Sequence, residues 1–431
     1  MNKKTHNYLK PVAKPFALAL ALASFASQAA SLTEIYQQAA SNAPQIRGAT
    51  AALEAAKQTL PQSQANFLPN VAIGANATVN DSTTITNSQS AFISLRQSIY
   101  NIGNNIQRDS AMTTISQAEA QFAGAGQNLI LDVANAYFNV LAAEDSLAFA
   151  EAEKQSNARQ LEQTQQRFEV GLIAITDVHE SQAAYDSSVA QAIAAANAVD
   201  NSREQLRELT GQFPGSLAKL DETLPLLSPE PSDPARWSEL ALRNNPALLA
   251  AQEATNLARH NVDAQGASEH PTADLVLQHT EVNNGSASTT SGTSAVFSLN
   301  YSLYDGKRTK ANVSQARQQL RQSEEAYEQI RRATERQVRN AYRGVLSNIS
   351  QVQALKQAVI SNESALRAAE AGYEVGTRTT VDVLVARSNL FNAQRNYAQA
   401  RYNYVLNTLQ LHQAAGTLSE LQLEKIDNWL K

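Results

Sequence analysis

The chain has 431 residues with a formal net charge of −5, and it contains no cysteine. Proteins that bind nucleic acid usually carry a basic surface, so this acidic balance argues against nucleic acid as a partner. Hydrophobic residues make up 43% of the chain but aromatic residues only 6%, and much of the apolar content is alanine, which favours thin seams between helices over a large globular core.

Residues 1–29 have the pattern of a secretory signal peptide. Lysine side chains precede an apolar run over residues 16–25, and Ser27 and Ala29 form a small-x-small cleavage pattern, so we expect the mature chain to begin near Ala30. An N-terminal membrane anchor is the alternative, but the apolar run is shorter than a bilayer-spanning helix needs. Because the chain has no cysteine, an exported protein of this sequence must be stable without disulfides.

The remaining sequence repeats itself after about 200 residues. Glu169-Val170-Gly171 recurs as Glu374-Val375-Gly376, and Asp177-Val178 recurs as Asp382-Val383. This spacing predicts two structural repeats, one over residues 30–230 and one over residues 231–431, each with a helix, two strands and a long helical hairpin. A period this long excludes a small-repeat solenoid.

Each repeat begins with a helical stretch that ends at a proline, Pro69 or Pro271, because proline cannot donate to the helix ladder. Strand patterns follow near residues 70–101 and near residues 272–305. The four expected strands are residues 71–79, 92–100, 273–282 and 296–304, with polar loops over residues 80–90 and 283–294. Segments of about ten residues suit a tilted transmembrane strand. A soluble hairpin has the same pattern, but the repetition and the export signal favour the membrane.

A long helical hairpin follows the strands in each repeat. Residues 103–170 contain no proline, so they can form one helix of about 100 Å. Small or apolar residues recur at heptad spacing in this helix and in its counterpart: Leu129, Val133, Ala136, Val140, Ala143, Leu147 and Ala150, then Val338, Tyr342, Val345, Ile349 and Val352. Alanine in such seams predicts closely packed coiled coils.

Each hairpin is expected to turn at a glycine, Gly171 or Gly376, because glycine tolerates the left-handed conformation that ends many helices. The returning helices are expected to open at Asp177 and Asp382. An aspartate in that place caps free backbone N–H groups and complements the helix dipole, and Asp177 and Glu180 have the spacing of a capping box.

A single copy of this chain cannot complete such a structure. Four strands leave two open sheet edges, which lipid does not tolerate, and no run of about 20 apolar residues follows the signal. Several copies around an axis are therefore expected. The predicted fold class is mainly α with transmembrane β. Three copies would give twelve strands and twelve long helical segments.

The two expected hairpin turns have the sequences QRFEVGLIAITDV, residues 166–178, and YEVGTRTTVDVL, residues 373–384. Both segments resemble the periplasmic turns of the TolC family of outer-membrane channel-tunnels. Residues 135–141 and 400–404 also resemble helices of that family, and the similarity covers nearly the whole mature chain.

The resemblance implies an internally duplicated channel-tunnel, in which four strands per chain contribute to a twelve-stranded barrel in a trimer, joined to a long coiled-coil helical tunnel. This homotrimer would be the exit duct of a tripartite efflux or type I secretion system. The duct would lie in the outer membrane of a Gram-negative bacterium, with a large periplasmic part and a gate at its periplasmic end. Its implied partners are outer-membrane lipid, a periplasmic adaptor (membrane fusion protein) and an inner-membrane transporter that supplies the energy. The duct itself would be no enzyme and would need no cofactor.

The resemblance also implies roles for residues at the turns. Asp177, Tyr373 and Arg378 form a gating network that holds the periplasmic end closed. Asp382 supplies a ring of three carboxylates that selects cations, although both aspartates also fit a purely capping role. Val385 stands where the family often has a further aspartate, so one ring is expected. The turns that dock the adaptor are Val170, Gly171 and Leu172, and Val375, Gly376 and Thr377.

Other readings have less support in the sequence. The six histidines are scattered and no glycine-rich phosphate loop is present, so we expect neither a metal site nor an enzyme. A soluble periplasmic adaptor or a coiled-coil structural protein is the alternative, but neither explains the repeated strands.

One helix face carries Arg332, Arg336, Arg339 and Arg343. It is either a basic stripe facing a lumen or a solvated face paired with Glu328 and Glu335.

Overall fold

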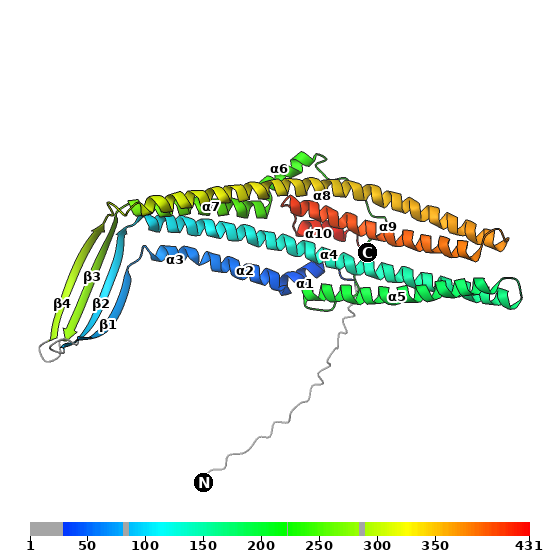
Figure 1. The fold of residues 1–431 in the computed structure, drawn as a ribbon, viewed down its shortest axis with the longest axis horizontal. Coiled ribbons are helices and arrows are strands. Elements are labelled where there is room, and N and C mark those ends of the chain that lie inside the picture. The colour runs from blue at the N-terminus through cyan, green and yellow to red at the C-terminus, as the bar shows by residue number, and fades with distance from the viewer. Residues whose placement is uncertain (1–28, 81–85, 222, 284–288) are drawn as a thin grey trace, which may run out of the picture.

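The computed structural model describes residues 29–80, 86–221, 223–283 and 289–431. The predicted signal peptide, residues 1–29, therefore lies outside the described residues except for Ala29. The described chain is an elongated rod with a β-sheet at one end, two helical hairpin tips at the other, and smaller helices near its middle (Figure 1). Among the described helices, none combines the length and the apolar character that crossing a membrane requires.

The strands form one antiparallel sheet in chain order. They are β1 (Asn70–Asn80), β2 (Thr86–Tyr100), β3 (Thr272–Asn283) and β4 (Thr289–Asn300). The two halves of the chain meet in this sheet, because β2 pairs with β3. Within the described residues, the outer edges of β1 and β4 have no strand partner.

The ends of two strands differ from the sequence prediction. β2 begins at Thr86, inside the predicted polar loop, and β4 covers residues 289–300 instead of 296–304. Ser291 of β4 lies opposite Glu281, so pairing with a neighbour extends a polar segment that an apolar pattern does not reveal. The predicted end of β4 was wrong because β3 begins at Thr272, opposite Asn300, and offers no partner beyond it.

The sheet has one apolar face and one polar face. Alternate residues of the strands share the apolar face and are exposed: Val71, Ile73, Val79, Ile93, Leu277, Phe297 and Leu299. The other face carries an ion pair between Arg96 of β2 and Asp274 of β3, with 3.2 Å between nitrogen and oxygen. A continuous apolar surface of this kind needs lipid or a protein partner to cover it.

Two long hairpins form most of the rod. Helices α4 (Ile102–Glu169) and α8 (Arg308–Glu374) run from the sheet to the tips, and α5 (Ile175–Thr210) and α9 (Thr380–Ala414) return to the middle. The predicted uninterrupted helix of residues 103–170 is confirmed. α5 packs on α4 and α9 packs on α8, while α4 and α9 join the two hairpins.

Shorter helices cover the half of the rod nearer the sheet. α2 (Pro44–Lys57) and α3 (Thr59–Ala65) pack along α4. α7 (Pro246–Gly266), followed by the short 3-10 turn η1 (Ala267–Glu269), packs against both α4 and α8. The long helices are therefore supported by neighbours near the sheet and by each other near the tips.

The main apolar core lies at mid-length. There α1 (Leu32–Asn42), α6 (Pro234–Asn244) and α10 (Glu420–Asp427) close around the long helices. The buried Tyr137 of α4 donates its hydroxyl hydrogen to the Ala30 carbonyl oxygen at 3.0 Å. Asp427 accepts from the Leu32 and Thr33 N–H groups at 2.9 and 3.2 Å, so the end of the chain caps its first described helix.

The arginine face of α8 is exposed, and Arg332 at its start is ion-paired. Arg332 binds Glu328 at 2.7 Å, as the helical spacing predicts. Glu335 was predicted to bind Arg339 but binds Arg331, at 2.8 Å, because Arg331 lies between two carboxylates and reaches both. Hydrogen bonds from Arg331 and Arg332 lower the pKa of Glu328 to about 2.

Candidate functional site at the hairpin tips

Both hairpin turns end their long helix with the same pair of backbone hydrogen bonds. In α4, Gly171 N–H donates to Phe168 O and Leu172 N–H donates to Arg167 O, each at 2.9 Å. The same arrangement ends α8 at Gly376. This arrangement satisfies free carbonyl groups at the helix end but requires one residue with a left-handed backbone conformation. The φ angles of Gly171 and Gly376 are 77° and 78°, which is that conformation. The predicted glycine caps are confirmed.

Asp177 and Asp382 lie at the third position of the returning helices, not at the cap position predicted from the sequence. α5 begins after Ala174, whose N–H donates to Asp177 Oδ2 at 3.3 Å. At the start of α9, Thr379 N–H donates to Asp382 Oδ2 at 2.9 Å, and Asp382 N–H donates to Thr379 Oγ1 at 3.2 Å. Both aspartates thus cap by reaching back, and the predicted box between Asp177 and Glu180 was wrong.

The surroundings of Asp382 favour its charged form. The Thr379 N–H and hydroxyl donate to the carboxylate, and the Arg378 guanidinium adds positive potential, so the pKa of Asp382 lies below its usual value. Arg378 Nη1 lies 3.8 Å from Asp382 Oδ1, and both side chains are exposed. The carboxylate is therefore ionised at neutral pH and open to solvent.

Within the described part of one chain, no hydrogen bond or ion pair joins Asp177, Tyr373 and Arg378 to one another. Asp177 caps α5, and Arg378 lies beside Asp382. Tyr373 packs instead under Arg167 of the other hairpin, with 4.9 Å between the guanidinium carbon and the ring centroid. The Tyr373 hydroxyl is buried and has no hydrogen-bond partner among the described residues.

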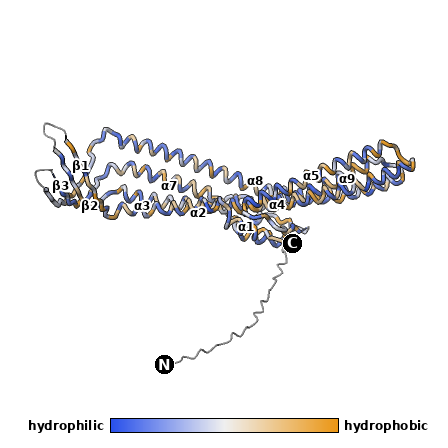
Figure 2. Tube along the Cα trace, turned by 90° about the horizontal axis from the view of Figure 1, so that it is seen from below, coloured by the Kyte–Doolittle hydropathy of each residue, from blue (hydrophilic) through white to orange (hydrophobic). Residues whose placement is uncertain are grey.

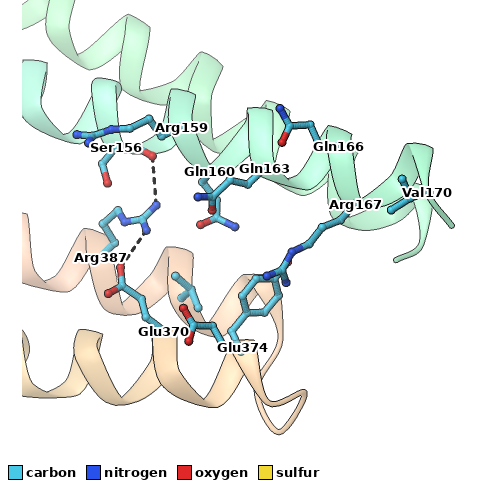
Figure 3. A pocket seen from close by; sticks show the side chains of 12 residues that line it. Ser156, Arg159, Gln160, Gln163, Gln166, Arg167, Val170, Glu370, Glu374 and Arg387 are labelled. Atoms are coloured by element: carbon cyan, nitrogen blue, oxygen red, sulfur yellow. Dashed lines mark hydrogen bonds and ion pairs between the residues drawn. The ribbon is translucent and has the colours of Figure 1, made fainter. Parts of the chain in front are cut away.

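A cavity of about 720 Å³ lies between the two hairpins just above the turns. Figure 3 shows Gln160 and Arg167 of α4 on one side, Glu370 of α8 on the other, and Arg387 of α9 reaching across. Sequence reasoning missed Arg387. The available signal was its position on α9, in register with the buried Val383 and Leu390, where a helical seam normally carries apolar residues.

The turns present apolar side chains to the outside. Val170, Leu172 and Val375 are 70%, 74% and 75% exposed, and the tips are among the orange parts of the helical region in Figure 2. Exposed apolar side chains at the end of a rod fit contact with another protein.

Comparison with known proteins places this geometry in a family. The sequence matches the family model described as outer membrane efflux protein over residues 35–212 and 237–417. It is 39% identical to the outer membrane protein TolC of Vibrio cholerae over 423 residues, covering 96% of this chain and 97% of that protein. It is 27% identical to the alkaline protease secretion protein AprF of Pseudomonas aeruginosa, covering 92% and 86%.

The fold also matches a solved structure. The structure of CusC, which is described as a transmembrane channel, aligns with a TM-score of 0.80 over 95% of this chain and 99% of that chain. The sequence identity of this pair is 18%, so the match is one of fold.

Proposed function

Because this chain belongs to the outer membrane efflux protein family and is an exit duct of the outer membrane, we propose that three copies form one channel through that membrane and the periplasm. The sheet carries this proposal: its two outer strands have no edge partner among the residues that the structure describes, and its apolar face is exposed. Pairing β1 of one copy with β4 of the next satisfies both edges, and lipid covers the apolar face. The result is the predicted twelve-stranded barrel.

The division of the chain into repeats of residues 30–230 and 231–431 is part of this proposal. In each half, two strands precede a long helix, a glycine turn and a returning helix. Since both hairpins end at the same level of the rod (Figure 1), a trimer would present six tips at its periplasmic end. A duplicated chain thus supplies six similar hairpins from three copies.

The hairpin tips are the proposed docking surface for a periplasmic adaptor. The exposed Val170, Leu172 and Val375, with Thr377 and the two turn glycines, would form the contact. An inner-membrane transporter, joined through the adaptor, would select the cargo and supply the energy. The family is named for efflux and one relative for protease secretion, and a passive duct that performs no catalysis serves both.

Asp177, Tyr373 and Arg378 are the proposed gating network at the same end. Arg378 is exposed in one chain, so its guanidinium can meet a neighbouring copy around the axis. A buried hydroxyl without a partner costs free energy, and the Tyr373 hydroxyl is such a group. A small shift of the tips in the trimer that gives it the Asp177 carboxylate as acceptor would remove this cost.

Single-channel recording in a planar bilayer tests the duct together with the proposed Asp382 ring. We expect the mature protein to give small, cation-selective conductance steps. Asp382→Asn keeps an oxygen acceptor for the Thr379 N–H but removes the charge, so cation selectivity should fall while thermal stability changes little. Asp382→Ala also removes the acceptor, so it should lower both selectivity and stability.

Asp186→Asn is the control, because it removes an exposed carboxylate from α5 away from any helix start. It should leave selectivity unchanged. If the Asp382→Asn channel keeps its cation selectivity, Asp382 acts only as a helix cap and the proposed carboxylate ring is wrong. If the mature protein forms no pores and stays soluble without detergent, the proposed channel is wrong. The alternative, a soluble periplasmic coiled-coil protein, would then be favoured.

A further inference from the structure

Near the tips, α4 buries polar side chains at spacings of four, three and four residues: Glu153, Asn157, Gln160 and Thr164. Glu153 and Gln160 face the α8–α9 hairpin, whereas Asn157 and Thr164 bond Ala184 and Ser181 of α5 in their own hairpin. The residues that the same helix buries at mid-length, between positions 129 and 141, are all apolar or aromatic. Burial along α4 thus changes from apolar side chains to hydrogen bonds and charges, which water can replace more readily.

Two arginines of α9 reach across the seam between the hairpins, Arg387 to a carbonyl of α4 and Arg395 to a carboxylate of α4, and Arg387 is also paired with Glu370 of its own hairpin. Arg387 Nη1 donates to Ser156 O of α4 at 3.4 Å, and its Nη2 lies 3.2 Å from Glu370 Oε1 of α8 (Figure 3). Two turns further along α9, Arg395 Nη1 lies 3.2 Å from Glu153 Oε2 of α4. α9 is therefore tied to the other hairpin at two levels.

Arg387 crosses the seam beside a cavity. Its side chain is only 8% exposed, yet it lines the cavity of about 720 Å³ between the hairpins. The Gln160 side chain lines the same cavity, and its buried Nε2 has no hydrogen-bond partner among the described residues. A part of the seam with empty volume and an unsatisfied hydrogen-bond donor has a lower local stability than a closely packed part. A single side chain that bridges the two hairpins there therefore contributes strongly to holding them together.

We propose that Arg387, supported by Arg395, clamps the α8–α9 hairpin against the α4–α5 hairpin in the closed duct, and that opening of the periplasmic end requires this clamp to release. The inference rests on the proposed gated duct. It adds a positioning residue above the tip residues Asp177, Tyr373 and Arg378. Release at the level of Arg387 is feasible because it breaks only the bond to Ser156 O, which is 3.4 Å long, while Glu370 lies in the same hairpin and can keep Arg387 as its partner.

The test compares Arg387→Gln with Arg332→Gln in the mature trimer. Arg387→Gln removes the clamp but strands no buried charge, because Glu370 remains in contact with water. Arg332→Gln breaks an arginine–glutamate pair of similar length that lies within α8 alone. In bilayer recordings, Arg387→Gln should raise the ratio of open to closed channels about tenfold or more, the effect expected when charge-assisted hydrogen bonds are lost from one state. Arg332→Gln should gate like the wild type.

Two further measurements separate a clamp from a general structural role. In the double variant Arg387→Glu with Glu370→Arg, the ion pair inside the α8–α9 hairpin can re-form in the opposite orientation. A carboxylate at position 387 cannot donate to Ser156 O of α4, so the open fraction should stay raised. Its return to the wild-type value would show that the pair inside the hairpin, and not a clamp between the hairpins, sets the gating. The chain has no cysteine, so a spin label at Thr377→Cys reports the distance between the tips of the trimer without background labelling. Adding Arg387→Gln should lengthen that distance.

The supporting role of Arg395 needs a paired change, because Arg395→Gln alone would leave the Glu153 carboxylate buried without a partner. Glu153→Gln with Arg395→Gln neutralises both side chains. Added to Arg387→Gln, this pair should increase the open fraction again, and the absence of any increase would overturn the role of Arg395.

The outcomes for the clamp and for the duct are distinct. A wild-type protein that conducts, beside an Arg387→Gln variant with unchanged gating and unchanged tip distances, overturns the clamp and leaves the duct standing. A wild-type protein that does not conduct overturns the proposed duct itself.

Discussion

Replacing Gly416 with alanine is expected to destabilise the folded chain by more than about 4 kcal/mol. Gly416 follows α9 with a φ of 72°, and an added Cβ would lie 2.3 Å from the Asn244 carbonyl oxygen and 2.6 Å from Asn245 N. Both atoms belong to the backbone between α6 and α7, so neither can rotate aside as a side-chain end can. The left-handed conformation costs a further 1–2 kcal/mol, roughly, once a side chain is present. Thermal unfolding followed by circular dichroism measures the loss.

Gly171→Ala and Gly376→Ala are the controls for this prediction. Both glycines have nearly the same left-handed φ as Gly416, but no neighbouring atom lies within 4 Å of their added Cβ. They should therefore show only the conformational cost of about 1–2 kcal/mol. Equal losses at all three positions would mean that the junction between α6 and α7 yields to the extra carbon and does not constrain the end of α9.

The double variant Arg378→Ala with Tyr373→Phe is expected to conduct several times more current per channel than the wild type. Arg378 lies beside Asp382 at the turn, and Tyr373 packs against Arg167 of the other hairpin. The hydroxyl that Tyr373→Phe removes has no partner within the described chain, so its effect must arise from contacts made in the trimer. Charge-assisted bonds contribute only a few kcal/mol, roughly, which suits a gate that must open. Single-channel conductance is the measurement.

Arg343→Ala serves as the control, because Arg343 is an exposed residue of α8 that hydrogen-bonds Asn340 of its own helix. Its conductance should equal that of the wild type. Arg378→Lys keeps the charge without the planar fork of the guanidinium, so it should give an intermediate conductance. A double variant that conducts like the wild type would show that Asp177, Tyr373 and Arg378 do not hold the periplasmic end closed.

Local patterns in the sequence were sufficient for the main elements of this fold. α4 is one helix because residues 103–170 lack proline and repeat small and apolar side chains at heptad spacing. The hairpins turn at Gly171 and Gly376 because no other residue adopts that backbone conformation at so little cost. The strands follow from alternation and length. Each of these features depends on residues that are close together in the sequence. The sequence of a single chain is therefore enough to predict them.

Long-range packing set the features that these patterns did not reveal. β4 ends at Asn300 because its partner β3 begins opposite that residue, and the clamp at Arg387 depends on Ser156, 231 positions away in the chain. The start of α1 has a local cap from Ser31 and Glu34, but two further N–H groups there donate to Asp427, 395 positions from Leu32. Such contacts exist only once distant segments lie side by side, and neither periodicity nor turn chemistry records which segments will do so.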